Sequence, residues 1–490
     1  MSGGLPAGWV ETALPRVALL NPKSFLDDAT EVAFVPMPHV PTNFSDKMRF
    51  ENRLWGDVKK GFTHFRNDDV IFAKITPCFE NGKATIVPNL PNAHGAGSTE
   101  FYVLRPIIVP SAFLFYWVKT SAFLKTAEAQ MAGTVGQKRV PKSFVESHPF
   151  PLPPLNEQKR IVAKLDDIMP RIDSVKERLE KIPAILKRFR QSVLNAAVTG
   201  KLTEKWREEH PELESADELL NEKMRMDKQH YASYWNDFDI PQKWICALLK
   251  NIADLRLGKM LDSSKNKGVS MLYLRNINVR WFGFDLESLK EIRITQAEKE
   301  ALSIRPGDVF VCEGGEPGRS AVWKAPESNI TFQKALHRVR MKIAFLPDLL
   351  VYNLKADADK QKLDELFTGS TIKHFTGRSL AGYPVAIPPL DEQKEIVRQV
   401  DKLLTLADKM EEHYQKARVK VDALAQSILA KAFRGELVQQ NPDDEPAEKL
   451  LQRIQEEKAK MEAELKIASQ NARKARRNAP KPFKKQAGEP

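Results

Sequence analysis

A chain of 490 residues is too long for one ordinary hydrophobic core and predicts roughly two to four domains. Its formal net charge of +12 favours partners that carry phosphate, although ribosomal factors and membrane-surface proteins share such a charge. Cys78, Cys246 and Cys312 are far apart, which argues against a disulfide framework or a thiolate zinc site and fits a reducing cytoplasm. The N-terminus lacks a secretory pattern, and the most apolar run, residues 113–118, is far shorter than the ~20 residues of a membrane span. We expect that run to be the buried face of a helix.

Residues 1–150 contain short runs of β-forming residues separated by turn signals. The run at 69–73 is one of them, and a short helix is expected around 111–129. A segment of this length and pattern predicts a mixed α/β domain.

Residues 151–202 predict the first of two long helices. The motif Pro-Pro-Leu-Asn-Glu-Gln-Lys at 153–159 suits its start, because the prolines hold the chain extended and Asn156 can cap the first free N–H groups. Gly200 suits its C-terminal end. Apolar residues recur between these points at alternating spacings of four and three, which is the pattern of a coiled-coil seam. A helix of about 45 residues would be roughly 65 Å long and would need a partner for this seam. The seam positions are Ile161, Leu165, Ile168, Ile172, Val175, Leu179, Ile182, Leu186, Phe189 and Val193.

Residues 203–236 predict a polar linker that is helical around 216–226. Residues 237–384 predict a second mixed α/β domain, in which the clearest strand, at 308–312, directly follows a Pro-Gly turn.

Residues 385–440 predict the second long helix, which starts with Pro-Pro-Leu-Asp-Glu-Gln-Lys at 388–394. The tail at 441–490 should begin as a helix. After Ile467 it carries lysines and arginines but no acidic residue before Glu489, which predicts disorder. The seam of this second helix, completed by alanines at 407 and 417, contains Ile396, Val400, Leu403, Met410, Tyr414, Val421, Leu424 and Ile428.

The two halves of the chain repeat at an offset of 235 residues. Trp9 recurs as Trp244, the motif at 153–159 recurs at 388–394, and Gly200 recurs as Gly435. The long helices align without a gap, whereas the two mixed α/β segments align poorly. The chain is therefore a tandem duplication of divergent domains on like-patterned helices, which a pseudo-two-fold axis can relate.

These features resemble the specificity subunits of type I restriction–modification enzymes. The resemblance spans essentially the whole chain and is carried by LPPLNEQKRIV, IPPLDEQKEIV, ILKRFRQSVLNAAVTGKLTEKWR and QSILAKAFRGEL. It implies an α+β fold in which 1–150 and 237–384 are target-recognition domains, each reading one half of a split, asymmetric double-stranded DNA site. It also implies that the two long helices pack antiparallel as a coiled coil, set the spacing of the half-sites and dock two modification subunits. Those methyltransferase subunits bring S-adenosylmethionine and methylate adenine, and restriction subunits that translocate and cut DNA complete the enzyme.

The residues argue separately against a catalytic site in this chain. The only Pro-Pro pairs lie in the two helix-start motifs, so the N/D-P-P-aromatic signature of amino-methyltransferases is missing. No strand–GxGxxG–helix unit and no GxxxxGK[ST] loop occurs, and the glycines at 314–318 predict a surface turn. The nine histidines form no HxH or HExxH pattern that would predict a metal site. We therefore expect a non-catalytic subunit without a cofactor of its own.

Candidate DNA contacts are basic and amide side chains on strands and loops. Basic and apolar residues alternate at 337–343, so a strand there would show its basic residues on one face, or the face is simply solvated. The loops at 133–139 and 373–378 precede the long helices and suit phosphate contacts, or they are ordinary basic turns. The stretch at 274–278 resembles one that lies near DNA in many relatives. The candidates are Gln137, Lys138, Arg139, Arg275, Asn278, Arg338, Arg340, Lys342, Lys373 and Arg378.

The starts of the two long helices are candidate contacts for the modification subunits, unless they serve only to begin the helices. The residues concerned are Glu157, Gln158, Lys159, Glu392, Gln393 and Lys394. Two alternatives remain open at this point. The chain could be a coiled-coil adaptor whose two domains bind proteins, or an enzyme with an unrecognised active site in one domain.

Overall fold

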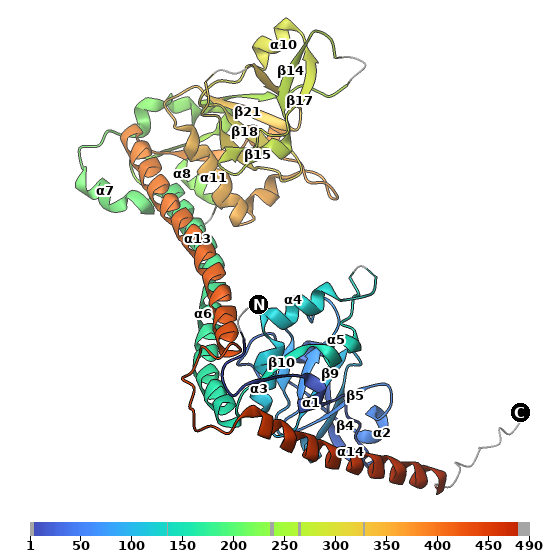
Figure 1. The fold of residues 1–490 in the computed structure, drawn as a ribbon. Coiled ribbons are helices and arrows are strands. Elements are labelled where there is room, and N and C mark those ends of the chain that lie inside the picture. The colour runs from blue at the N-terminus through green and yellow to red at the C-terminus, as the bar shows by residue number, and fades with distance from the viewer. Residues whose placement is uncertain (1–3, 135, 236–239, 263–265, 327–328, 479–490) are drawn as a thin grey trace, which may run out of the picture. The chain divides into compact units, whose positions relative to one another are not determined.

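A computed structural model describes residues 4–478 apart from 135, 236–239, 263–265 and 327–328 (Figure 1). The chain divides into two compact units. Unit 1 combines residues 1–180 with 415–490, and unit 2 comprises 181–414. Each of the two long helices, α6 (Leu155–Val198) and α13 (Leu390–Ala432), therefore begins in one unit and ends in the other.

Unit 1 is built on two four-stranded sheets. The first has the order β2-β9-β6-β7 and is antiparallel. The second has the order β4-β3-β8-β5, in which β3 and β8 run parallel. A separate two-stranded sheet pairs β1 with β10. The strands are β1 Val10–Ala13, β2 Ala18–Leu20, β3 Glu31–Val35, β4 Glu51–Leu54, β5 Thr63–Arg66, β6 Val70–Ala73, β7 Ala84–Ile86, β8 His94–Gly97, β9 Phe101–Pro106 and β10 Pro149–Leu152.

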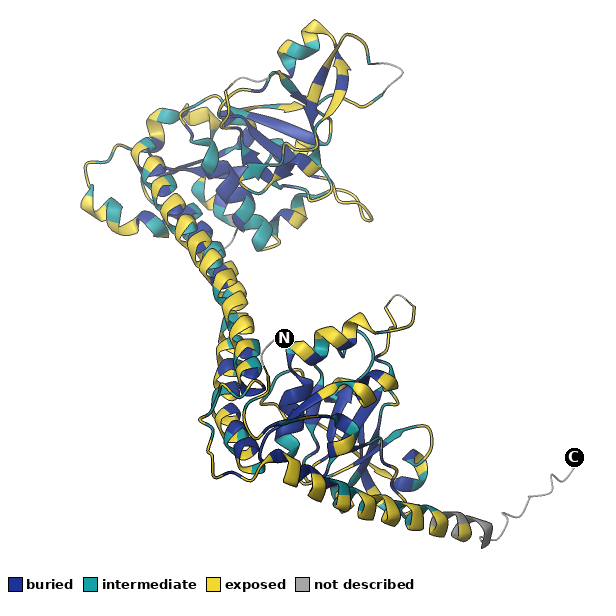
Figure 2. Cartoon of the chain, viewed as in Figure 1, coloured by how far each residue is buried: buried dark blue, intermediate teal, exposed yellow. Residues whose placement is uncertain are grey.

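The largest core of unit 1 joins its first sheet to helices from distant parts of the sequence. It contains residues of α3, the first half of α6, the end of α13 and the start of α14. The apolar run at 113–118 lies in α3 and is buried, as the sequence predicts (Figure 2). The shorter helices of this unit are α1 Leu14–Val17, η1 Met37–His39, α2 Trp55–Val58, η2 Pro91–Ala93, α3 Ser111–Val118, α4 Ser121–Ala129 and α5 Lys142–Ser147.

Unit 2 repeats the arrangement of unit 1. Its antiparallel sheet has the order β13-β21-β18-β19, and its second sheet has the order β17-β14-β20, with β14 and β20 parallel. A third sheet contains β11, β12 and β22, and β15 and β16 form a hairpin. The strands are β11 Arg225–Met226, β12 Ile245–Leu248, β13 Ala253–Leu257, β14 Val269–Leu274, β15 Val279–Arg280, β16 Gly283–Phe284, β17 Lys290–Ile294, β18 Val309–Cys312, β19 Ser320–Val322, β20 Ile330–Phe332, β21 Leu336–Met341 and β22 Pro384–Ile387.

The main core of unit 2 packs α11, the end of α6 and the start of α13 against the antiparallel sheet. The linker holds two α-helices, and the helix expected at 216–226 is replaced by 3-10 turns and strand β11. The helices are η3 Lys201–Thr203, α7 Glu204–Glu209, η4 Ala216–Leu219, η5 Glu222–Met224, α8 Lys228–Trp235, α9 Leu249–Ile252, η6 Asn276–Asn278, α10 Gln296–Ala301, α11 Pro347–Asp359, η7 Lys362–Leu366 and α12 Gly377–Ala381.

In each unit, the C-terminal end of a long helix that begins in the other unit packs against the start of the domain. Gly435, after α13, has φ +74°, and a Cβ there would lie 2.5 Å from Cγ of Pro6. Gly200, after α6, also has φ +74°, and its Cβ would lie 2.7 Å from Cγ of Pro241. Glycine is therefore required at both positions by its conformation and by the close approach of a proline. Each unit of the duplicated chain therefore contains the start of one long helix and the end of the other.

The tail differs from the prediction of disorder after Ile467. Helix α14 (Ala447–Asn478) continues eleven residues past this point, and residues 479–490 lie outside the described part of the chain. Its first turns are anchored in the core of unit 1 by Leu450 and Ile454, which are fully buried. Alanine, lysine and arginine are good helix formers, and basic residues near a helix C-terminus interact favourably with its dipole, so the helix can extend beyond its anchor.

Candidate nucleic-acid interface

The repeated motif at the helix starts is a buried anchor. Nε1 of Trp9 donates a hydrogen bond to Oε2 of Glu157 (2.9 Å), and Nε1 of Trp244 donates to Oε2 of Glu392 (2.8 Å). Glu157 is 1% exposed and Glu392 is fully buried. Burial raises the pKa of Glu157, and the hydrogen bond from Trp9 partly offsets that rise. The tryptophan and the glutamate therefore recur together because each fixes the start of a domain to the start of a long helix.

The neighbouring glutamines serve the same purpose. Nε2 of Gln158 donates to the carbonyl of Pro153 (2.8 Å), and Nε2 of Gln393 donates to that of Pro388 (2.9 Å). The prediction that this motif docks a partner is therefore corrected for four of its six residues, whose side chains are buried: Glu157, Gln158, Glu392 and Gln393. Lys159 and Lys394 are exposed and stay candidates for such a contact.

Helices α6 and α13 pair antiparallel in both units. In unit 1, Nζ of Lys176 lies 2.7 Å from Oδ1 of Asp422. In unit 2, Nη2 of Arg190 lies 2.9 Å from Oδ1 of Asp408. The second pair is fourteen residues later in α6 and fourteen residues earlier in α13, which is the relation that an antiparallel coiled coil requires.

Fewer of the predicted seam residues are buried between the two helices than the alternating spacing of four and three predicts. Val175, Met410 and Leu424 are 43%, 50% and 51% exposed, which corrects their assignment. The reason is geometric: a straight helix drifts by roughly 20° per heptad from a strict seven-residue repeat, so Ala425 and Leu429 are buried instead. The buried seam residues are Ile161, Leu165, Ile172, Leu186, Val193, Ile396, Val400 and Tyr414, and the half-buried ones are Ile168, Leu179, Ile182, Phe189, Leu403, Val421 and Ile428.

The arginines of β21 hold the fold of unit 2 together instead of presenting a basic face. Arg340 makes two hydrogen bonds to Asp308, of 2.6 and 2.7 Å. Arg338 is 4% exposed, donates to the carbonyls of residues 301 and 303, and pairs with Asp254 at 3.2 Å. The two residues do share a face of the strand, but that face is covered, so neither is a candidate DNA contact. Lys342 is exposed, but it lies one residue beyond the C-terminal end of β21.

The stretch at 274–278 is also structural in large part. Asn278 is fully buried, accepts a hydrogen bond from the backbone N–H of Arg275 (2.9 Å) and donates to the carbonyl of Asp285 (2.9 Å). Asn278 is therefore corrected from a DNA contact to the residue that shapes this turn. Arg275 is half-buried and donates to the carbonyl of Ser288 (2.5 Å).

In unit 1 the predicted basic loop lies beside the turn that connects β6 to β7. The backbone N–H of Thr76 donates to the carbonyl of Lys138 (3.0 Å), and residues 75 and 139 form an isolated β-bridge. Gln137, Lys138 and Arg139 are all exposed, and Arg139 pairs with Glu100 at 2.9 Å. We call residues 74–83, 132–134 and 136–139 the sheet-end surface of unit 1.

Unit 2 brings the equivalent loops together at the same end of its sheet. The backbone N–H of Phe375 donates to the carbonyl of Glu313 (2.8 Å), and that of Glu313 donates to Ala335 (2.9 Å). Residues 313–319, 333–335 and 368–375 form the sheet-end surface of unit 2. Lys373 is exposed there and pairs with Asp364 at 2.6 Å, and Arg378 is exposed on the adjacent helix α12.

The family of type I restriction modification DNA specificity domains matches this chain twice, over residues 23–184 and 241–420. The chain belongs to this family. The two matches correspond to the two copies of the repeat, and membership supports a role in DNA specificity instead of the alternative of a protein-binding adaptor.

Two specificity subunits of Escherichia coli are similar to the chain. The type I restriction enzyme EcoKI specificity subunit of Escherichia coli strain K12 is 33% identical over 481 residues, which cover 94% of this chain and 97% of that protein. The EcoAI specificity subunit of Escherichia coli is 34% identical over 329 residues, and this match spans 56% of each protein.

Solved structures show the same fold. A chain from a study of complex assembly and conformational transition of the type I R-M system superposes with a TM-score of 0.65 at 22% identity, over 89% of this chain and 100% of that chain. The HsdS subunit from Thermoanaerobacter tengcongensis superposes with a TM-score of 0.56 at 21% identity, over 89% of this chain and 99% of that chain.

One exposed lysine of the sheet-end surface of unit 2 is not among the candidates predicted from the sequence. Lys334 lies on the sheet-end surface of unit 2, between β20 and β21. Its position three residues before the strand predicted at 337–343 was the available signal. Within the described ranges, no group of three or more His, Cys, Asp or Glu side chains is placed to hold a metal ion. No helix in those ranges combines the length and the apolar character that crossing a membrane requires.

Proposed function

We propose that this chain selects the DNA sequence for a type I restriction–modification complex, and that each unit reads one half of a split, asymmetric site through its sheet-end surface. The observation that carries the proposal is that the two surfaces lie at the equivalent ends of the two corresponding antiparallel sheets but differ in their residues. Basic and amide side chains at such a surface suit phosphate contacts and base readout, and different loops select different bases. Lys138 in unit 1 and Lys334 in unit 2 are exposed examples.

We propose that partner subunits supply the methylation and cleavage reactions. Two modification subunits would bind S-adenosylmethionine and methylate adenine, and restriction subunits would add translocation and cleavage. The paired long helices would set the spacing between the two half-sites. The chain itself would contribute recognition and assembly, and purified chain alone should neither methylate nor cut DNA.

An exchange of one domain tests independent reading. Residues 1–150 are replaced by the matching domain of a relative, and the variant is combined with its modification subunit on genomic DNA. Sequencing of methylated sites should show one changed half-site and one unchanged half-site. A change in both halves would contradict the assignment of one half-site to each unit.

A finer test uses single residues of the two surfaces. Lys138→Ala and Lys334→Ala should each weaken DNA binding and lower the slope of binding against salt concentration by about one, as the loss of one phosphate contact does. Lys342→Ala is the matched control, because Lys342 is also exposed but lies beyond the opposite end of β21. Equal effects of all three substitutions would rule out the sheet-end surfaces as the binding site.

A further inference from the structure

One hydrogen bond at the sheet-end surface recurs in both units. In unit 1, Nζ of Lys83 donates to the carbonyl of Met37 (3.0 Å). In unit 2, Nη2 of Arg319 donates to the carbonyl of Asn276 (2.8 Å). Each basic residue directly precedes the edge strand of its antiparallel sheet, β7 or β19, and each carbonyl belongs to the first residue of a 3-10 turn, η1 or η6. The hydrogen bond therefore joins the turn before the edge strand to the 3-10 turn beside it.

The strands show that the two hydrogen bonds are equivalent. The backbone carbonyls of Lys83 and Arg319 accept from the last residue of β6 and of β18, at 3.0 and 2.8 Å. The 3-10 turns begin two residues after β3 and after β14, the strands that form the parallel pair of each second sheet. The donors are 236 residues apart and the acceptors 239, whereas the long helices repeat at 235. The repeat in the sequence therefore does not align these residues.

The turns held by this hydrogen bond have diverged. Ten residues, 74–83, connect β6 to β7, whereas seven residues, 313–319, connect β18 to β19. Lys83 and Arg319 are half-buried, so the hydrogen bond lies at the surface and not in a core. The two units have thus kept a basic residue at the end of the turn, although the length and the sequence of the turn have changed. Such a residue fixes the position of a turn whose other side chains are free to differ.

In unit 2 further contacts hold the same turn. Nη1 of Arg319 lies 2.7 Å from Oε2 of Glu316, and Oε1 of Glu316 accepts a hydrogen bond from Nε1 of Trp281 (2.8 Å). The backbone also approaches η6 closely, because a Cβ at Gly315 would lie 2.7 Å from Nδ2 of Asn276. Arg319 therefore joins two turns directly, and Glu316 connects them to the β15–β16 hairpin.

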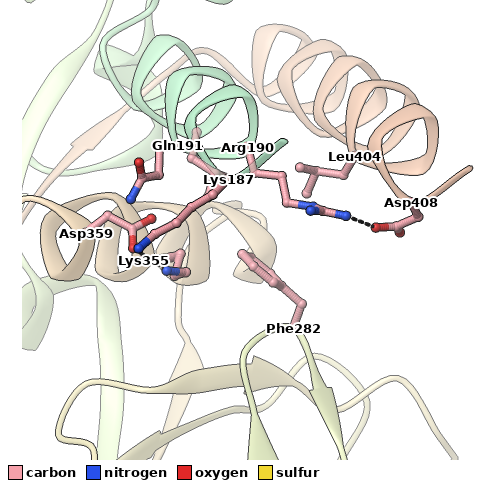
Figure 3. Close-up of a pocket in the computed structure, with 9 residues that line it drawn as sticks. Lys187, Arg190, Gln191, Phe282, Lys355, Asp359, Leu404 and Asp408 are labelled. Carbon is pink, nitrogen blue, oxygen red and sulfur yellow. Dashed lines mark hydrogen bonds and ion pairs between the residues drawn. The ribbon is translucent and has the colours of Figure 1, made fainter. Parts of the chain in front are cut away.

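The β15–β16 hairpin is packed against α11. The ring of Phe282 lies 6.2 Å from that of Tyr352, and Nζ of Lys355 lies 5.2 Å from the ring of Trp281. Figure 3 shows Phe282 projecting from the hairpin toward the helix that carries Lys355. The turn at 313–319 is therefore connected, through side chains, to a helix in the core of unit 2, and this connection limits the positions that the turn can take.

We propose that Arg319 and Lys83 are positioning residues for DNA recognition, each of which fixes the recognition turn of its unit against the neighbouring 3-10 turn. This inference rests on the proposed function. A site that reads bases must hold its donors and acceptors within about 0.5 Å of their productive positions, and a turn that is ordered before binding loses less entropy when DNA arrives. The side chain of Arg319 is only 14% exposed, so other residues of the turn contact the bases. Because each positioning residue serves one unit, its loss should relax selectivity in one half-site only.

The test measures methylation by the full chain with its purified cognate modification subunit. The substrates are duplexes with the recognised site or with one substituted base pair in either half-site, and the exchange of residues 1–150 identifies the half-site that each unit reads. Arg319→Ala should lower the ratio of kcat/KM between the recognised and the substituted site by about ten-fold in the half-site of unit 2, which is the order of discrimination that one base pair carries. The ratio for the half-site of unit 1 should not change. Lys83→Ala should have the converse effect.

Two further variants separate positioning from other roles of the side chain. Arg319→Lys should restore most of the lost selectivity, because a lysine makes the equivalent hydrogen bond in unit 1. Arg293→Ala is the matched control and should leave selectivity unchanged. Arg293 is an exposed arginine of β17, and it pairs with the start of β14, at the opposite end of that strand from η6. Thermal unfolding of each variant measures any loss of folding, which lowers methylation at all sites alike and does not alter selectivity in one half-site.

The outcomes separate this inference from the function on which it rests. If Arg319→Ala leaves selectivity as Arg293→Ala does, or relaxes both half-sites, the inference is overturned. Equal losses of kcat/KM for recognised and substituted sites, with a lower slope of binding against salt concentration, would identify Arg319 as a phosphate contact and would also overturn it. A failure of Arg319→Lys to restore selectivity has the same consequence. In each of these cases the unaltered chain still directs methylation to a split site; if it does not, the proposed function fails and this inference fails with it.

Discussion

In unit 1 the guanidinium of Arg105 makes two hydrogen bonds of 2.9 Å to Asp69, and in unit 2 that of Arg340 makes two, of 2.6 and 2.7 Å, to Asp308. Both aspartates directly precede a central strand of the antiparallel sheet. The two units have kept this buried ion pair although most of their sequence has diverged. A buried carboxylate without its partner is strongly destabilising, so neither member of the pair can change alone.

The same two units differ where a loop meets the long helices. In unit 1, Nζ of Lys119 donates to the carbonyls of residues 42 and 43, both at 2.7 Å. Oδ2 of Asp173 accepts a hydrogen bond from the backbone N–H of Phe44 (2.8 Å). We call these contacts, which hold the loop at 42–45, the clasp of unit 1. Unit 2 has the tight β15–β16 hairpin there and a groove lined by residues of α6, α11 and α13 (Figure 3).

The loop contacts are hydrogen bonds at the edge of a core, and their loss in one copy does not expose the core itself. After the duplication, the two units therefore kept the interactions that their interiors require, whereas their surfaces diverged. Recognition and docking can differ between the copies at those surfaces.

Substitution of the buried arginines tests whether the ion pair is equally important in both units. Arg105→Met should lower the free energy of unfolding by about 3–5 kcal/mol, because it leaves Asp69 buried and unpaired. Arg340→Met should cost less, on the order of 1–3 kcal/mol, because 27% of the Arg340 side chain is exposed and water can reach the aspartate that remains. Urea unfolding followed by hydrogen exchange in each unit measures both effects. Arg53→Met, in an exposed pair with Glu51, is the control and should change stability by less than about 1 kcal/mol. Equal losses for Arg105→Met and Arg340→Met would show that the exposure of Arg340 does not matter.

The clasp of unit 1 predicts a pH dependence. Burial lowers the pKa of Lys119 from 10.5 to about 7, and the nearby Asp173 carboxylate partly offsets this shift. Between these two pH values the unfolded chain holds a proton that the folded chain has released, so this group makes stability rise with pH, by up to about 1.4 kcal/mol per pH unit. Lys119→Met should remove that rise between pH 7 and 9.5 in urea unfolding. Asp173→Asn should extend the rise to lower pH, because it removes a charge that favours the protonated lysine. A slope that is unchanged by Lys119→Met would contradict this account.

The long helices and the duplication could be predicted because periodicity and repetition are properties of the sequence itself. The candidate DNA contacts on β21 were wrong because alternation shows which residues share a face of a strand and not what covers that face. Asp308 and Asp254, which cover it, lie 32 and 84 residues away from their arginines. The hydrogen bonds that hold the loop at 42–45 could not be predicted either, since Phe44 and Asp173 are 129 residues apart.

One long-range contact did leave a signal in the sequence. Trp9 and Glu157 are 148 residues apart, and so are Trp244 and Glu392. Two residue types that recur together at the same separation indicate a contact in both copies. Glu157 and Glu392 were nevertheless predicted to dock a partner, unless they only begin the helices, because a repeated motif can indicate a shared surface as well as a shared interior contact.

The two tryptophan–glutamate pairs should differ in strength. Trp9→Phe removes a hydrogen bond from buried Glu157 and should cost about 1–3 kcal/mol. Trp244→Phe should cost less, because Glu392 also accepts a hydrogen bond from Thr203 at 2.7 Å and pairs with Arg207 at 2.5 Å. The loss from Trp9→Phe should shrink as the pH falls through the raised pKa of Glu157, since the protonated acid tolerates burial without its donor. Thermal unfolding at neutral and acidic pH measures both comparisons. A larger loss from Trp244→Phe would mean that ring packing, and not the hydrogen bond, dominates at this position.

The smallest expected effects are those of the ion pairs between the long helices. Lys176 meets Asp422 in unit 1, whereas Arg190 lies 2.9 Å from Asp408 and 3.7 Å from Glu411 in unit 2. Lys176→Met and Arg190→Met should each cost less than about 1 kcal/mol, because the partner carboxylates are well exposed and exposed pairs are weak. Arg190→Met should cost more of the two, since its guanidinium faces two acids. A double-mutant cycle with Lys176→Asp and Asp422→Lys isolates the first pair, and the exchanged pair should recover most of the loss at low salt and little at high salt. If the exchanged pair recovers nothing at low salt, these residues do not face each other in solution and the antiparallel register of the two helices in unit 1 is wrong.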